Sequence, residues 1–263
     1  MTSRPVVPRP AATVVLLRDG SAGIEAYLLR RVTGMAFAGG MTVFPGGSVD
    51  PEDARADPPW VGPDPQTWAR RLGTDETLAR ALVCAAVRET FEESGVLLAS
   101  PAAGRGVGAR LADVAGADWE AERAALESRR QTLSDLLTRR GLLLRTDLLA
   151  AWSHWITPEG EPRRYDTRFF IAALPARQQT RHVGGEADAV LWMRPADALA
   201  ARLRGELPML PPTATTLAEL SAYDSVTAAV AGAAERSITP VLPRIVTEGG
   251  HTRIVLPREE GYE

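Results

Sequence analysis

Residues 86–98, AVRETFEESGVLL, constrain the fold of this chain more than any other segment. Glu89, Glu92 and Glu93 lie within five residues of one another, shortly before Gly95. A helix advances about 100° per residue, so residues at i, i+3 and i+4 share one helical face. The segment therefore predicts a helix that places three mutually repelling carboxylates side by side.

The surrounding pattern predicts that this helix spans residues 74–94, with Thr74 as its N-terminal cap and Gly95 as its terminator. The carboxylates then fall in the last turns, where the helix dipole disfavours each by roughly 0.3–1 kcal/mol. Arg88 can pair with Glu92 one turn further on, which offsets only part of the excess. Spacing alone leaves two interpretations open: a solvated helix face, or a site that binds a divalent cation through oxygen ligands.

A glycine-rich stretch precedes the acidic helix. Residues 34–47 contain five glycines around a short strand predicted at 41–44, and they end in the tetrapeptide FPGG. Glycine at this density indicates backbone that bends sharply or approaches a ligand closely.

The rest of the chain alternates strand-like and helix-like segments. We expect strands at 12–17, 25–29, 151–157, 167–174 and 187–193, helices at 118–140 and 196–204, and one or two helices between 213 and 236. The proline-rich residues 54–73 are expected to form an irregular surface insertion, and residues 241–246 and 252–256 a hairpin. This order predicts an α/β (α+β) fold in one domain, a mixed sheet sandwiched between helices, with insertions at about 54–73 and 101–145 and a C-terminal extension from about 208.

Charge and composition exclude several classes of protein. The 30 basic and 33 acidic residues leave a net charge of −3, so we expect no nucleic-acid or membrane partner. The single cysteine, Cys84, forms no intrachain disulfide, and its place among alanines predicts a buried structural thiol. No segment reaches the roughly 20 apolar residues of a membrane span, and the first ten residues lack the apolar core of a signal peptide. A cytoplasmic protein is expected.

FPGG and the acidic helix together resemble the box of the Nudix hydrolases: a glycine, five residues, a glutamate, seven residues, then R-E-U-x-E-E-x-G-U with U apolar. Residues 88–96 match the second half except at Thr90. The first half is present as Gly47 and Asp53, a carboxylate one methylene shorter than the family's glutamate. Since 34 residues separate Asp53 from Arg88, a 27-residue insertion interrupts the box. The two halves need only meet in space, and loop-closure entropy grows slowly with length.

The interrupted box is similar to that of one Nudix branch, the peroxisomal coenzyme A diphosphatases and their bacterial relatives. Further similarity lies in the segments LLRRVTGMAFAGGMTVFPGGSVD, WSHWITPEGEPRRYDTRFFIAALP and LPMLPPTATTLAEL. The resemblance implies hydrolysis of a diphosphate linked to another moiety, with Mg²⁺ or Mn²⁺ as cofactor. Coenzyme A or an acyl derivative is the first expectation for the substrate. NADH, ADP-ribose, a nucleotide sugar, or a Nudix module that binds without turnover are the alternatives.

The resemblance also assigns residues by position. It implies metal binding by the side chains of Glu89, Glu92 and Glu93 and by the carbonyl of Gly46, with Arg88 orienting the acids. The base is either Glu89 or Glu186, which lies in a later loop. Substrate binding is expected at Gly47, Arg30, Arg31 and Arg168, although each arginine alone also fits an ordinary surface position. Nudix proteins are often dimers, so a homodimer is left open.

Overall fold

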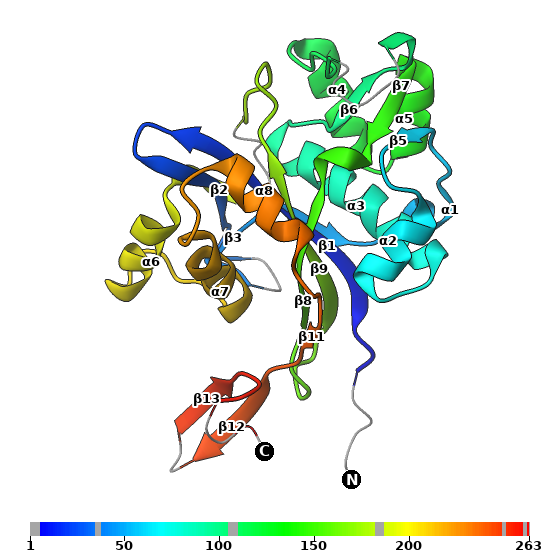
Figure 1. Cartoon of the computed structure of the whole chain (residues 1–263). Helices are drawn as coiled ribbons and strands as arrows, with labels where there is room; N and C mark the ends of the chain where they lie inside the picture. The colour runs from blue at the N-terminus through cyan, green and yellow to red at the C-terminus, as the bar shows by residue number, and fades with distance from the viewer. Residues whose placement is uncertain are drawn as a thin grey trace.

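The computed structural model describes residues 6–34, 38–104, 110–181, 187–248, 251–259 and 262. In this part of the chain an eight-stranded sheet runs through the centre of the molecule, in the order β10-β2-β1-β9-β8-β11, with β3 paired to β2 and β4 to β1 (Figure 1). Its strands are β1 (Arg9–Gly20), β2 (Gly23–Arg31), β3 (Thr42–Val43), β4 (Gly46–Ser48), β8 (Ala150–Ile156), β9 (Tyr165–Ala173), β10 (Ala187–Met193) and β11 (Pro240–Val241). Because β1 pairs with β9 in parallel and with β2 antiparallel, the sheet is mixed.

Helices cover both faces of this sheet, which confirms the predicted fold class (Figure 1). One side carries α1 (Pro51–Arg55), α2 (Pro65–Leu72), α3 (Glu76–Ser94), α4 (Ala117–Glu127) and α5 (Leu133–Arg140). The other side carries α6 (Pro195–Leu203), α7 (Pro211–Leu220) and α8 (Val226–Ala234). Alternation along β1 divides the core accordingly: Val14 and Leu16 pack in the cluster that includes α3, and Val15 and Leu17 in the cluster that includes α7 and α8.

The acidic helix α3 ends as predicted and begins one residue later than predicted. Gly95 is its C-cap, with a left-handed φ of 72°. The N-cap is Asp75, whose side chain accepts from the Leu78 amide at 2.9 Å, so the prediction of Thr74 as the cap was wrong. Either residue type can cap a helix, and the neighbouring aspartate makes the bond.

Residues 54–73 are not irregular as predicted. They contain β5 (Trp60–Val61) and α2, and β5 joins β6 (Ala99–Pro101) and β7 (Leu142–Arg145) in a three-stranded sheet. Trp68 of α2 is 1% exposed and packs edge-on against Phe170 of β9, with ring centroids 5.7 Å apart. Proline density was misleading because Pro65 occupies the first turn of α2, where a missing N–H costs nothing.

The helix predicted over 118–140 is two helices, α4 and α5. Thr132 caps α5 by accepting from the Asp135 amide at 3.1 Å, while the Asp135 carboxylate accepts from the Thr132 amide. This capping box starts a new helix inside a continuous apolar pattern. Short 3₁₀ turns flank the region at Ala102–Gly104 and Thr146–Leu148.

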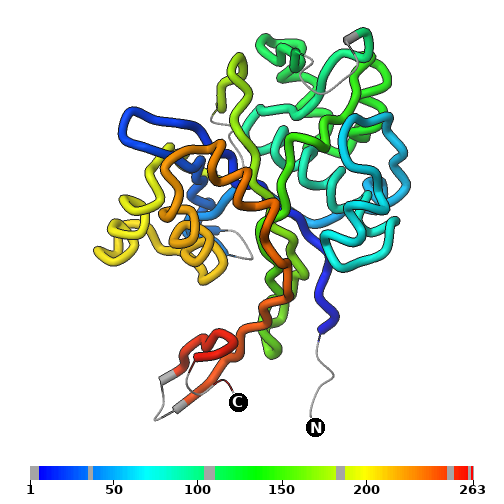
Figure 2. Tube along the Cα trace, viewed as in Figure 1, coloured from blue at the N-terminus to red at the C-terminus, as the bar shows by residue number. Residues whose placement is uncertain are grey.

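The C-terminal region follows the prediction, with α7 and α8 and then a hairpin of β12 (Arg244–Glu248) and β13 (His251–Val255). This hairpin projects from the body beyond β11, as the orange-to-red end of the trace shows (Figure 2). Cys84 is fully buried, and burial raises the pKa of its thiol to about 12, which supports the structural role predicted for it. Among the described residues, no helix combines the length and apolarity that crossing a membrane requires.

Candidate active site

The two separated parts of the box meet at a buried ion pair. Asp53, in the first turn of α1, is 3% exposed, and its Oδ2 lies 2.8 Å from Nη2 of Arg88 on α3. Nε of Arg88 also donates to both oxygens of this carboxylate, at 3.1 and 3.2 Å. The pKa of Asp53 is raised because burial outweighs the opposing effect of Arg88. The insertion therefore leaves the box assembled in space.

Arg88 also holds two of the three glutamates. Its Nη1 donates to Glu89 at 2.7 Å and to Oε2 of Glu92 at 3.3 Å, and its Nη2 donates to the Ser48 carbonyl at 2.9 Å. Burial opposes the charge on Arg88, but the hydrogen bonds to Asp53 and the neighbouring carboxylates raise its pKa overall. One buried guanidinium thus links β4, α1 and the acidic face of α3.

The glycines of FPGG lie directly against the same face. The Gly46 amide donates to Oε2 of Glu93 at 2.8 Å. A Cβ on Gly47 would lie 2.5 Å from Oε1 of Glu89, and one on Gly46 would lie 2.5 Å from the Ala12 carbonyl oxygen. Gly46 is thus required by its close approach to the backbone of β1, whereas a side chain at Gly47 would displace the Glu89 carboxylate.

Negative charge exceeds positive charge within this cluster. Arg88 is shared by the carboxylates of Asp53, Glu89 and Glu92, all of them at most 13% exposed. Burial, with the adjacent Glu89 charge adding to it and Arg88 opposing it, raises the pKa of Glu92 to about 7. Buried carboxylates in excess over their cationic partner are the donor chemistry that a hard divalent cation requires.

The three glutamates are bound to protein partners. In the described part of the chain, no group of three histidine, cysteine, aspartate or glutamate side chains converges on one point that could hold a metal ion. Glu89 and Glu92 turn toward Arg88, and Glu93 turns toward the Gly46 amide. The carboxylate oxygens of Glu89, Glu92 and Glu93 are the type of ligand that a divalent cation binds. In this structure Arg88 and the Gly46 amide bind these oxygens.

A cavity of about 860 Å³ opens beside these residues. Gly46, Gly47 and Glu89 line it together with many apolar residues. The apolar and aromatic lining includes Phe44, Trp155, Tyr165, Phe169, Leu210, Pro211, Pro212 and Ile254. Arg31, Arg129 and Arg163 add positive charge. The cavity therefore combines an anion-binding part with room for an apolar group.

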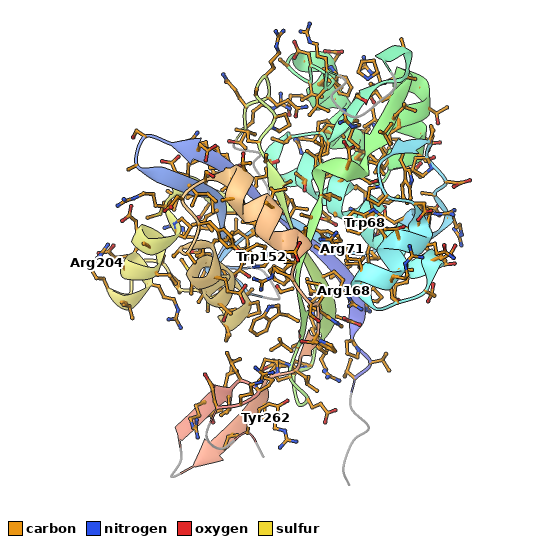
Figure 3. The ribbon with its side chains drawn as sticks, viewed as in Figure 1. Trp68, Arg71, Trp152, Arg168, Arg204 and Tyr262 are labelled. Atoms are coloured by element: carbon orange, nitrogen blue, oxygen red, sulfur yellow. The ribbon has the colours of Figure 1, made fainter. Side chains whose placement is uncertain are left out.

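Of the arginines predicted to bind substrate, only Arg31 lines this cavity. Arg30 points instead to the surface, where its Nε donates to Asp188 at 2.6 Å. Arg168, predicted to bind substrate, is 4% exposed, donates to the Leu72 carbonyl at 3.2 Å and to Asp166, and does not line this cavity (Figure 3). Strand alternation is the reason, because Thr167 and Phe169 face the cavity and Arg168 faces α2. Glu186, the alternative base, lies outside the described residues.

Thr90, the one departure from the second half of the box, is accommodated within α3. It is fully buried, and its hydroxyl donates to the Ala86 carbonyl at 2.7 Å. A threonine that bonds the preceding turn leaves no unsatisfied polar group at this apolar position.

Sequence reasoning missed Arg129 as a cavity residue, whereas it had placed Arg163 among the arginines near the expected site. Arg129 lies between α4 and α5, within a segment predicted to be continuous helix, so the periodic pattern carried no signal for it. The sequence feature that could have revealed it is the Ser/Thr-x-x-Asp pattern that begins at Thr132, because this pattern marks the start of a new helix after α4.

Comparison with known proteins agrees with this geometry. The family model described as the NUDT19 Nudix domain matches residues 70–220. The acyl-coenzyme A diphosphatase NUDT19 of Gallus gallus is 30% identical over 242 residues, covering 79% of this chain and 64% of that relative's length. Its Homo sapiens counterpart is 29% identical over 277 residues, covering 91% of this chain and 72% of the relative.

A solved structure extends the similarity to the fold. The crystal structure of a NUDIX hydrolase from Alicyclobacillus acidocaldarius is 33% identical, with a TM-score of 0.69, and the match covers 89% of this chain and 99% of that one. The assembled box, the cavity beside it and these matches together lead to one conclusion. The chain belongs to the Nudix hydrolases, within the NUDT19 Nudix domain family.

Proposed function

We propose that this protein hydrolyses the diphosphate bond of coenzyme A or an acyl-coenzyme A in a reaction that requires a divalent metal ion. The observation that carries the proposal is the assembly of the interrupted box: Arg88 binds Asp53 and holds Glu89 and Glu92 beside Gly46 and Gly47. The names of the NUDT19 relatives, and a cavity with both charged and apolar walls, support the choice of substrate.

We assign metal binding to Glu89, Glu92, Glu93 and the Gly46 carbonyl. A bound Mg²⁺ or Mn²⁺ would neutralise phosphate oxygens and activate the attacking water. Arg88, anchored by Asp53, keeps Glu89 and Glu92 in place between turnovers. Gly47 leaves space for the diphosphate next to Glu89, the glutamate of this group that lines the cavity.

The reaction consumes one water molecule, whose oxygen forms a bond to phosphorus as the bridging P–O bond breaks. The products are phosphopantetheine, or its acyl form, and an adenosine bisphosphate. Glu89 or Glu186 accepts the water proton, and we favour Glu89 because it lines the cavity. A homodimer and a cytoplasmic location remain predictions.

The test is a substrate panel. Purified protein is incubated with Mg²⁺ or Mn²⁺ and with coenzyme A, an acyl-coenzyme A, NADH, ADP-ribose or a nucleotide sugar, and products are identified by mass. We expect coenzyme A or the acyl form to be cleaved fastest. Cleavage of NADH with coenzyme A left intact would assign the alternative substrate, and no turnover of any compound would favour a binding module.

A further inference from the structure

We propose that Arg129, contributed by the segment inserted between the strands of the sheet, binds the diphosphate oxygens of the substrate. This inference rests on the proposed function, because it deepens the account of the same cavity. Arg129 lines that cavity together with Gly47 and Glu89, although it lies 40 residues after Glu89 in the chain.

The backbone at Arg129 is in a conformation that favours glycine. Its φ is 56°, and it directly follows Ser128, the C-cap of α4. The Arg129 amide donates to the Leu126 carbonyl at 2.7 Å, and the Arg130 amide donates to the Ala125 carbonyl at 2.8 Å. Helices that end in this way usually carry glycine at the left-handed position, so an arginine there is unfavourable for the backbone. The local backbone conformation therefore does not explain why an arginine occupies this position.

The ion pair of Arg129 does not explain it either. Nη2 donates to Oδ1 of Asp50 at 2.8 Å, but the arginine side chain is 77% exposed. An exposed ion pair of this kind contributes little to stability, because water competes for both charges. Within the described residues the other guanidinium nitrogens have no partner, which leaves donors for a second anion.

The position of Arg129 is fixed relative to the catalytic helix. Arg123 of α4 is 8% exposed, and its Nη1 donates to the Glu92 carbonyl at 3.1 Å. Trp119 of α4 packs edge-on against Phe91 of α3, with ring centroids 6.2 Å apart. These contacts anchor α4 on α3, so the backbone of the residue that follows α4 is fixed beside the cavity.

The charge of the site gives this guanidinium a role. Carboxylates dominate the wall formed by β4 and α3, and Arg88 is already committed to three of them. A diphosphate approaching this wall therefore gains from a cation that can leave Asp50 and bind phosphate oxygens in the same fork geometry. Asp50 binds this guanidinium only while the substrate is absent, and the substrate replaces it.

Three variants test the inference: Arg129→Gly, Asp50→Asn and the control Arg130→Ala. Arg130 donates to the Ser128 hydroxyl at 2.9 Å and does not line the cavity. For each variant we would measure KM and kcat with coenzyme A, the Kd for ADP with Mg²⁺ by calorimetry, and the thermal midpoint. ADP serves as a diphosphate probe that needs no turnover.

We expect Arg129→Gly to raise both KM and the Kd for ADP about tenfold or more, without lowering the thermal midpoint, because glycine suits the backbone. Asp50→Asn breaks the same ion pair but should raise neither constant, and Arg130→Ala should resemble the wild type. If Arg129→Gly and Asp50→Asn raised KM and the Kd for ADP equally, the ion pair would be structural and the inference would be overturned. Unchanged KM and Kd in Arg129→Gly would also overturn it. If the wild type cleaves no compound of the panel while Arg129→Gly still weakens ADP binding, the proposed function fails and the assignment of Arg129 stands.

Discussion

At the level of single residues, the end of α3 gathers negative charge where a helix tolerates it least. No basic residue lies in its last turn, and the compensation comes from elsewhere. Arg123 donates to the Glu92 carbonyl at 3.1 Å, and Nη2 of Arg181 donates to the Gly95 carbonyl at 3.3 Å. Two arginines distant in sequence thus bind carbonyls at the end of α3. The glutamate side chains are not used to offset the helix dipole and can serve the candidate active site.

Replacing Glu93 by glutamine tests the catalytic assignment. The amide oxygen still accepts from the Gly46 amide, so we expect the fold to be retained, while kcat falls by roughly 10²–10⁴-fold because a carboxylate is lost. Steady-state kinetics and circular dichroism measure the two effects. Glu52→Gln, on the exposed side of α1, is the matched control and should keep full activity. A Glu93→Gln enzyme with unchanged kcat would contradict the assignment.

Arg168 belongs to a structural cluster, and its carboxylate partner predicts a pH dependence of stability. Nε2 of His154 lies 2.5 Å from Oδ1 of Asp166 and 2.7 Å from Nη1 of Arg168. Burial alone would raise the pKa of Asp166, but the hydrogen bond with His154 and the charge of Arg168 outweigh it and lower that pKa.

A lowered pKa means that Asp166 stabilises the fold above its unfolded pKa of about 3.9 and loses that effect as the pH falls through the folded pKa. We expect Asp166→Asn to lose roughly 1–3 kcal/mol of unfolding free energy at pH 7, because Arg168 keeps its buried charge without its carboxylate partner. The difference from the wild type should shrink as the pH falls below the unfolded pKa of about 3.9 and through the lower folded pKa. Urea denaturation between pH 7 and pH 3 measures it, and a difference independent of pH would refute the explanation.

At the level of secondary-structure elements, the insertion between the halves of the box is part of the hydrophobic core. Trp68 and Leu72 of α2 are buried in the same cluster as Leu82 and Phe91 of α3. The segment therefore stabilises the helix that carries the glutamates, and it is not a surface loop attached to a complete domain.

Trp68→Ala should cost about 3–5 kcal/mol of unfolding free energy, since it removes a large buried ring from contact with Phe170. Trp60→Ala is the control, because this tryptophan in β5 is only partly buried and should cost less. Urea denaturation of the two variants compares the losses. Equal small losses would mean that the insertion packs loosely, contrary to the structure.

Sequence patterns predicted most strands and the C-terminal helices because their periodicity is local. They failed where one residue's local preference differed from the composition of the segment around it. Pro65, for example, begins a helix in a proline-rich segment that was predicted to be irregular. They failed again at Thr132, whose capping box divides one apolar pattern into α4 and α5. Both failures lie in the insertions that shape the site.

At the level of the whole molecule, binding of a divalent ion should stabilise the folded protein. An ion at 100 times its Kd adds about 2.7 kcal/mol, which raises the thermal midpoint by several degrees in a chain of this size. Differential scanning fluorimetry with and without Mg²⁺ measures this shift, and Glu93→Gln should reduce it. A midpoint unchanged by Mg²⁺ and Mn²⁺ in the wild type would contradict the metal site.

The sequence by itself determined the acidic helix, its glycine terminator, the FPGG strand and the mixed sheet. The helix, its terminator and the short strand follow from patterns within about 20 residues, because helical periodicity and glycine conformation act locally, and the mixed sheet was predicted from the order of strands and helices along the chain. It also indicated that Asp53 and Arg88 are parts of one box, but not how the chain joins them.

Only the tertiary structure decided which arginines reach the cavity. Arg30, Arg31 and Arg168 look equivalent in sequence, yet Arg31 lines the cavity, Arg30 pairs with Asp188 and Arg168 packs under α2. Arg129 reaches the cavity from an insertion through contacts of α4 with α3. The direction of a side chain depends on strand register and on the packing of distant elements, and no local pattern encodes either.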